Sequence, residues 1–391
     1  MAGFVNDLTA KERARFLESA RLGALWFRHN QNTHERTWGG VDESADTGRF
    51  LYEYFPTTGY CRGTGVWSQG LAVCGLLAVA DAIGDRSFRE AAVLGGGYLK
   101  SLQWLDARQP ACVGGFREHN PQDLWSFPRD GATGCFALAV LARETDDADA
   151  LDRANLFCRW YSTSGSDDTT WPYDYYDFAK REGTCEVPGD WQAGGALCYY
   201  YTAKAAGNDT WINDGFRPVA ERLVTLADPT DVDGTEHGWH GQSRITVGND
   251  DFATVALMAA FLCFENERYL DVVRKRIDWL MSLQDDDGSF PNSGGTFVTA
   301  LTLLEFVDLI EAKGLPDATA PLIDSLLAAA RFGLSLQETE SRDRRAYGGF
   351  YGQSNYGVSR DRIHNRSTNY SIHLNLRLAG HDAPCLRALG W

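Results

Sequence analysis

The sequence predicts an all-α fold, an (α/α)6 toroid with six outer and six inner helices, on three observations. A turn that sets an aromatic residue beside glycine or proline recurs about every 62 residues. Four of these turns follow a helix ending in which glutamine stands five residues after an aromatic residue. Each turn separates an amphipathic stretch from an almost wholly apolar one, which indicates a two-helix repeat that stacks on its neighbours.

The turns and helix endings locate the repeats along the chain. The six turns are Trp38-Gly39-Gly40, Gly114-Gly115-Phe116, Trp171-Pro172-Tyr173, Gly238-Trp239, Gly288-Ser289-Phe290 and Gly348-Gly349-Phe350. The four shared helix endings run from Trp26 to Gln31, from Tyr98 to Gln103, from Trp279 to Gln284 and from Phe332 to Gln337. No Pro/Ser-rich linker interrupts them, so we expect one domain over residues 1–391.

The outer helices are expected to be amphipathic. In the stretch 269–284, Val273 and Ile277 share one face while Arg274 and Asp278 take the other. Corresponding stretches lie near residues 9–30, 86–103, 147–162, 211–227, 268–284 and 317–337.

The inner helices are expected to be apolar on every side, because other helices surround them. The stretch 252–264 has this character apart from Thr254. The inner helices are predicted to begin near Val66, Asp130, Asp190, Asn249, Gly294 and Arg366. No alternating pattern is long enough for a large sheet, although the loops 40–60 and 340–362 have room for short β-hairpins.

Composition narrows the class of protein. A net charge of -16 argues against nucleic acid, whose phosphates require a basic surface. The nine cysteines include no CxxC pair, which suggests buried thiols in a reducing compartment. The N-terminal residues lack the pattern of a signal peptide and no membrane span is apparent, so a cytoplasmic location is expected. The sequence leaves the oligomeric state open.

The repeat also resembles known families. The aromatic-x-x-x-x-Gln ending followed by glycine and an aromatic residue is similar to the repeat of the prenyltransferase and squalene-cyclase toroids. The same toroid is the scaffold of six-hairpin glycosidases, polysaccharide lyases and sugar epimerases. The resemblance covers nearly the whole chain, but it concerns the scaffold, so a function must be argued from the site.

The predicted site lies where the inner helices begin. Parallel inner helices bring their N-termini, with their partial positive charge, to one end of the ring. Asp130, Asp190 and Asp250 recur there at intervals of 60 residues. Each is also a plausible helix cap, but carboxyl groups with different environments are the usual equipment for acid and base catalysis. We therefore expect the catalytic residues among these aspartates and His364.

Polar and aromatic neighbours of these positions suit a substrate with many hydroxyl groups. The predicted substrate-binding residues are Trp67, Gln69, Trp191, Gln192, His240, Asp251, Arg366 and Tyr370. Arg62, Arg244 and Arg366 suit either a substrate carboxylate, as in a uronate, or a salt bridge to one of the aspartates of the ring. Neither the His237-Gly-Trp-His240 segment nor the Asp285–Asp287 turn has the spacing of a metal site, so no metal and no cofactor are expected.

Three functions remain in competition. The first is a carbohydrate-active enzyme, either a glycoside hydrolase, a lyase or an epimerase. The second is a terpenoid cyclase or prenyltransferase-like enzyme. It is prompted by Asp250-Asp251, which resembles the DxDD signature of protonation-initiated cyclases and implies Asp250 as the acid, with Gly248 in place of the first Asp. The third is a toroid that binds a protein or glycan without catalysis.

Overall fold

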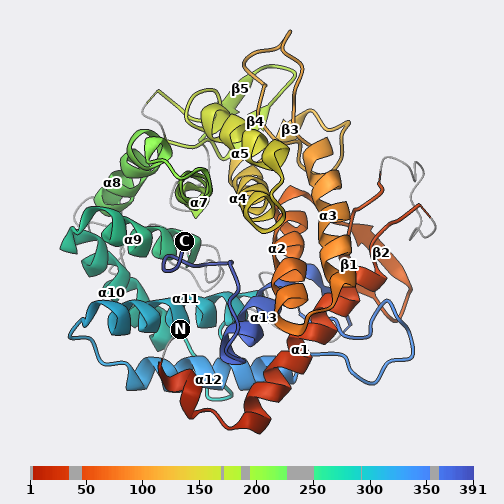
Figure 1. Ribbon diagram of the computed structural model, residues 1–391, viewed down its shortest axis with the longest axis vertical. Helices are drawn as coiled ribbons and strands as arrows, with labels where there is room; N and C mark the ends of the chain where they lie inside the picture. The colour runs from red at the N-terminus through yellow and green to blue at the C-terminus, as the bar shows by residue number, and fades with distance from the viewer. Residues whose placement is uncertain are drawn as a thin grey trace.

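The helices form two concentric rings, as Figure 1 shows for the computed structural model, which describes residues 3–34, 46–168, 171–185, 194–226, 251–291, 293–352 and 361–391. The outer helices are α1 (Ala10–His29), α3 (Arg86–Ser101), α5 (Ala148–Tyr161), α8 (Arg217–Leu226), α10 (Glu267–Ser282) and α12 (Ala320–Leu334). The inner helices are α2 (Val66–Ile83), α4 (Pro128–Thr145), α7 (Leu197–Ala206), α9 (Asp251–Phe264), α11 (Ser293–Lys313) and α13 (Asn365–Leu378). The predicted (α/α)6 toroid is confirmed; the expected inner-helix starts Asp190 and Asn249 lie outside the described residues.

Packing follows the division that the sequence predicted. Each inner helix contacts the next around the ring, and α13 contacts α2, which closes it. In α10 the buried side chains fall mainly on one face, whereas α9 is buried over most of its surface. Inner helix α13 is buried at every position although it is rich in polar residues. Buried polar groups need hydrogen-bond partners, so we expect the polar side chains of α13 to bond to one another, to neighbouring elements or to a ligand.

A repeated hydrogen-bond lock joins neighbouring repeats. The glutamine that ends an outer helix donates from its amide nitrogen to a glycine carbonyl in the following turn and to a carbonyl on the next outer helix. These partners are Gly48 and Ala91 for Gln31, Gly114 and Arg153 for Gln103, Gly288 and Ser325 for Gln284, and Gly348 and Ser19 for Gln337, at 2.9–3.1 Å. The last lock ties the end of α12 to α1.

The glycine of each lock is required by its backbone. Gly348 has φ +89°, and a Cβ there would lie 2.3 Å from the carbonyl oxygen of Leu22 in α1. The equivalent glycine of the first repeat is Gly48, with φ +94°. Gly48 is therefore the lock glycine of the first repeat. The predicted turn Trp38-Gly39-Gly40 lies outside the described residues.

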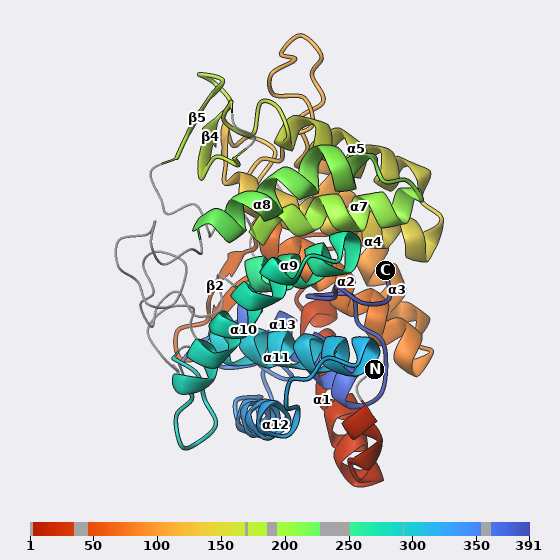
Figure 2. The same ribbon diagram turned by 90° about the vertical axis from the view of Figure 1, so that its left-hand side faces the viewer.

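Two small antiparallel sheets lie at the end of the ring where the inner helices begin (Figure 2). The first has the order β2-β1-β6, from β1 (Leu51–Phe55), β2 (Tyr60–Gly63) and β6 (Ile363–His364). The second has the order β3-β4-β5, from β3 (Trp125–Ser126), β4 (Tyr175–Asp177) and β5 (Glu182–Thr184). Strands of two to five residues are too short for an alternating pattern to reveal, and the second sheet was not predicted.

The C-terminal segment 379–391 enters the ring from the opposite end, and the C-terminus lies inside the ring in Figure 1. The Trp391 ring lies 4.5 Å from that of Tyr201, and the Arg143 guanidinium lies 4.0 Å from the Trp391 ring. The backbone N–H groups of Ala388 and Leu389 donate to the buried Glu305 carboxylate at 2.7 and 2.8 Å. This segment fills the axis away from the inner-helix N-termini.

Helix α2 is the one helix among the described residues that is long and apolar enough to cross a membrane. Within the protein, 78% of that helix window is buried. Its neighbours α4, α13, α1 and α3 account for this burial, so its apolar character is that of a core helix.

Candidate active site

The first turns of several inner helices bring aromatic and charged side chains together. The ring of Tyr370 in α13 lies 6.1 Å from that of Trp67 in α2 and 6.2 Å from that of Phe252 in α9. The Arg366 guanidinium lies 5.9 Å from the Trp67 ring. Burial raises the pKa of Tyr370, and the charges of Arg366, Asp251 and Asp130 act on it as well. The predicted residues of α2, α4, α9 and α13 therefore share one region.

Five of the predicted site residues lie outside the described residues. They are Asp190, Trp191, Gln192, His240 and Asp250. Asp251, which begins the described part of α9, is fully buried. The expected pairing of Asp190 with Asp250 stays a prediction.

Asp130 lies beside a second carboxyl group, that of Glu118. Glu118 is 2% exposed, accepts a hydrogen bond from the Phe127 N–H at 3.0 Å and is hydrogen-bonded to Asp130. Burial raises the pKa of Glu118 well above its ordinary value, and the negative charge of Asp130 raises it further. Both effects favour the protonated form of Glu118. Asp130 also contacts the Arg129 guanidinium at 3.2 Å.

Sequence reasoning missed Glu118, although the repeat contains a signal for it. Glu118 stands two residues after Phe116, the aromatic residue of its turn. A backbone bridge joins Gln103 to Phe116, and an equivalent bridge joins Ser166 to Pro172 in the next repeat. This register places Asp174 at the position of Glu118, so two successive repeats carry a carboxyl group here, whereas the last repeat, with its bridge from Gln337 to Phe350, has Gly352.

Aromatic side chains stand next to the carboxyl pair. Trp125 stacks on Tyr175 with ring centroids 6.0 Å apart, and its ring edge meets Phe127 at 5.2 Å. Phe127 is 38% exposed and immediately precedes α4. The backbone N–H of Glu118 donates to the Trp125 carbonyl at 3.2 Å, which couples the aromatic group to the carboxyl pair. Trp125 and Tyr175 thus provide an aromatic surface beside the segment that carries Glu118.

His364 caps α13 as a neutral imidazole. Its Nδ1 accepts a hydrogen bond from the Arg366 N–H at 3.1 Å, which puts the ring proton on Nε2. Burial lowers the pKa of His364 well below its ordinary value, and Arg362, Arg366 and Arg62 lower it further. In this arrangement His364 can donate a hydrogen bond from Nε2, and its expected catalytic role stays a prediction.

Gln69 serves the scaffold. Its side-chain oxygen accepts from the Phe50 N–H at 3.1 Å, and its amide nitrogen donates to the Gly48 and Gly95 carbonyls at 2.9 and 3.0 Å. Thr296 and Thr368 accept in the same way from the backbone of Phe290 and Phe350. Gln69 has no exposed surface, so the substrate contact expected of it lacks support here.

A cluster of arginines forms another side of the region. The Arg62 guanidinium lies 4.7 Å from the Tyr52 ring, and Tyr52 meets the edge of His364 at 4.8 Å. Glu53 pairs with Arg62 at 3.3 Å and with Arg362 at 2.9 Å. Since Arg366 acts on both Tyr52 and His364, positive charge concentrates here in spite of the acidic chain.

Comparison with known proteins identifies the architecture. No protein-family model and no curated protein matches this chain. Among solved structures, it is similar to the unsaturated glucuronyl hydrolase from Bacillus sp. GL1, with TM-score 0.66 and 14% identity over 97% of this chain and 100% of that one. It is also similar to the GH76A alpha-1,6-mannanase from Salegentibacter sp. HEL1_6, with TM-score 0.63 and 13% identity over 93% and 99%.

A third similar structure is cellobiose 2-epimerase from Bacillus thermoamylovorans B4167, with TM-score 0.60 and 11% identity over 82% of this chain and 91% of that one. Sequence identity this low speaks to the backbone arrangement and not to the reaction. The chain therefore has the same (α/α)6 toroid fold as these three structures.

Proposed function

We propose that this protein is a carbohydrate-active enzyme whose aspartates at the inner-helix N-termini act as acid and base on a sugar or uronate-containing substrate. The observation that carries the proposal is the Asp130–Glu118 carboxyl pair beside the Trp125–Tyr175 aromatic surface. Carboxyl groups supply proton transfer, and aromatic faces are suited to the apolar faces of sugar rings.

The proposed reaction needs two carboxyl groups in different protonation states. One protonates the leaving oxygen, and the other activates water or attacks the anomeric carbon. We assign these roles to Asp190, Asp250 and Asp130, in that order of preference. Glu118 holds a proton against Asp130 and so fixes the orientation of the Asp130 carboxylate. The inner-helix N-termini favour negative charge at this end of the ring.

The arginine cluster supports a substrate that carries a carboxylate. Arg366 and Arg62 lie near Tyr52 and His364, and a planar guanidinium binds a carboxylate through two parallel hydrogen bonds. A uronate at the end of an oligosaccharide has such a group. The similar structure named as a glucuronyl hydrolase is described as responsible for the degradation of glycosaminoglycan, which agrees with this choice.

The test is a turnover assay on a panel of oligosaccharides. The panel contains glycosaminoglycan fragments with an unsaturated uronate end, alpha-1,6-mannan fragments and cellobiose. Asp130→Asn, Asp190→Asn and Asp250→Asn are compared with the wild type, and Asp106→Asn, which removes a surface carboxylate paired with Arg108, is the control. We expect at least one of the three variants to lose 100-fold or more in kcat/KM while the control keeps its activity.

The competing functions predict other results. Turnover of a polyprenyl substrate, lost in Asp250→Asn, would identify a cyclase with Asp250 as the protonating acid. Glycan binding without turnover would identify a binding toroid. Full activity in all three aspartate variants on a turned-over glycan would refute the catalytic assignment.

A further inference from the structure

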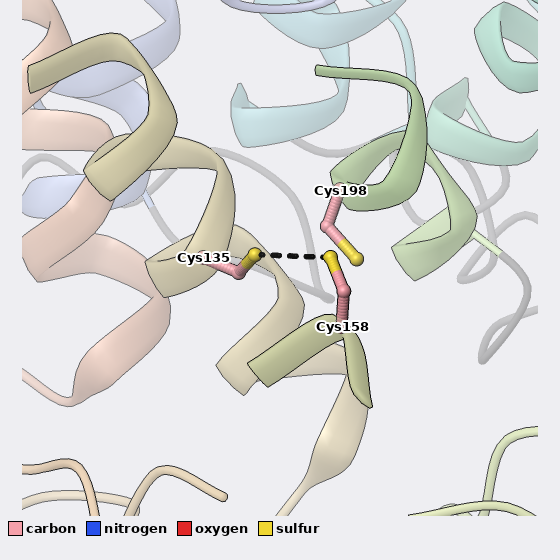
Figure 3. A group of neighbouring side chains, drawn as sticks. All are labelled: Cys135, Cys158 and Cys198. Carbon is pink, nitrogen blue, oxygen red and sulfur yellow. Dashed lines mark hydrogen bonds between the residues drawn. The ribbon is translucent and has the colours of Figure 1, made fainter. Parts of the chain in front are cut away.

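Three cysteines from different helices meet in the core, and none of them belongs to the carboxyl pair. Cys135 of α4, Cys158 of α5 and Cys198 of α7 point toward one another in Figure 3. Their sulfur atoms all lie within 4.8 Å of one another, and the Cys135 and Cys158 sulfurs are 3.8 Å apart. Each is at most 1% exposed. A single buried thiol serves as a small apolar filler, but three in contact form a set of soft ligands.

Polar groups lie against the cluster. The Cys135 sulfur lies 3.4 Å from the Thr202 hydroxyl. The Cys135 thiol also donates a hydrogen bond to the Ala154 carbonyl at 3.4 Å. Because the thiolate is the form that binds metals, an ion would take the place of the protons that these thiols carry.

The spacing of the sulfurs suits one small ion. At the roughly 2.3 Å metal–sulfur bond of thiolate sites, three sulfurs arranged in a plane around an ion lie about 4 Å apart. The Cys135–Cys158 separation of 3.8 Å is close to this value, and the 4.8 Å limit on the others requires a closure of less than 1 Å. Rotation of a cysteine side chain can supply such a shift without moving a helix.

The number of ligands favours one class of metal. Structural zinc sites almost always have four ligands, usually cysteine and histidine. Among the described residues, the other polar groups that contact Cys135 are the Thr202 hydroxyl and the Ala154 carbonyl, neither of which is a usual zinc ligand. Soft thiolates without a fourth ligand select Cu(I) among the biological ions.

A small cavity borders the cluster. Its volume is about 10 Å³, near that of one water-sized sphere, and both Cys198 and Phe252 line it. Phe252 contacts Tyr370 in the candidate active site. The cavity therefore lies between one thiol of the cluster and a residue of the candidate active site.

We propose that Cys135, Cys158 and Cys198 form a binding site for a soft monovalent metal ion, Cu(I). Each thiol that becomes a ligand releases its proton to solvent as a metal–sulfur bond forms, and the ion keeps its oxidation state. Because the ligands come from α4, α5 and α7, a bound ion joins two inner helices to an outer one and stabilises the fold. The site is independent of the proposed carbohydrate chemistry.

The test is a titration of the reduced protein with Cu(I) under argon, in competition with bathocuproine disulfonate. The more accessible Cys61, Cys185 and Cys263 are replaced by serine in the starting protein, so that they do not bind the ion. We expect one Cu(I) per chain and a rise in Tm on binding. Cys135→Ser and Cys198→Ser should weaken Cu(I) binding at least tenfold, whereas Cys74→Ser, which removes a buried thiol from α2, should not.

X-ray absorption on the loaded protein keeps the test decisive if a serine variant fails to fold. Three sulfur neighbours at about 2.3 Å support the site. Nitrogen or oxygen neighbours, equal binding in the Cys74 and Cys135 variants, or loss of the ion to the competitor would each overturn it.

Discussion

Replacing Glu118 by glutamine tests the carboxyl pair directly. In the folded protein, burial and the charge of Asp130 keep a proton on Glu118. In the unfolded chain the same group releases its proton as the pH rises above its ordinary pKa of 4.5. Unfolding therefore releases a proton, and the free energy of unfolding falls by about 1.4 kcal/mol for each pH unit between the two pKa values.

Glutamine lacks this titration but keeps the geometry. Its carbonyl oxygen can still accept from the Phe127 N–H, and its amide can donate to Asp130 as the protonated acid does. The unfolding free energy of Glu118→Gln minus that of the wild type should therefore increase by about 1.4 kcal/mol per pH unit from pH 5 upward, until the folded pKa is reached. Urea unfolding at pH 5, 6 and 7, followed by circular dichroism, measures this difference.

Two variants act as controls. The pKa of Glu338 is lowered because hydrogen bonds from Tyr351 and from backbone N–H groups outweigh its burial. Its stabilising effect is complete above its ordinary pKa and is lost only as the pH falls, so Glu338→Gln should show a difference that is constant from pH 5 to 7. Asp130→Asn removes a charge that raises the pKa of Glu118 and should narrow the pH range of the slope. A flat difference for Glu118→Gln over this range would refute a protonated Glu118.

Two further predictions concern the scaffold and are measured as shifts in Tm. Gly348→Ala places a methyl group 2.3 Å from the Leu22 carbonyl oxygen at a residue with φ +89°, so we expect the free energy of unfolding to fall by about 3 kcal/mol or more. Gly84 has φ +72° but open space around it, so Gly84→Ala should lower the free energy of unfolding by only roughly 1–2 kcal/mol. Equal losses would show that the contact with α1 can relax. Glu305→Gln removes a carboxylate 2.7 Å from the buried Arg377 guanidinium and should cost about 3–5 kcal/mol. Glu144→Gln, in the more exposed pair with Arg143, should change stability by less than about 1 kcal/mol, and a similar loss in both would contradict a special role for the buried pair.

The scaffold was predictable because its signals are local and repeated. Gln103 and Gln337 stand at the same spacing after an aromatic residue. Each donates to a glycine carbonyl in its turn and to a carbonyl on the next outer helix. Gly48 was not predicted, because the loop between Gln31 and Gly48 is longer than the corresponding loops of the other repeats. The Trp38-Gly39 pair, which lies nearer to Gln31, matched the sequence pattern instead. The second sheet escaped because its strands join segments about 50 residues apart, Trp125 with Asp177.

The site was only partly predictable, since sequence spacing gives the position of a residue on a helix and not the partner that it meets. Asp130 was proposed from the 60-residue interval. Its partner Glu118 was not, because it lies next to a repeat turn whose pattern indicates only a structural role. Gln69 has a polar side chain suited to substrate binding, yet that side chain is hydrogen-bonded to the backbone of Phe50 and Gly48. His364 looked free to move protons until its bond to the Arg366 N–H fixed its tautomer.

The lock between Gln337 and Ser19 has a consequence for how the chain acquires its structure. The other locks join neighbouring repeats, but this one joins residues 318 positions apart. Because synthesis runs from the N-terminus, helix α1 is made long before Gln337, its partner in this lock. In the finished fold, Gly348 packs against Leu22 of α1, and Trp26 of α1 donates a hydrogen bond to the Arg345 carbonyl. Until these later residues are made, this side of α1 is uncovered. Nascent chains should therefore be most prone to aggregation just before the final repeat emerges, and ring closure should be the slow step of refolding.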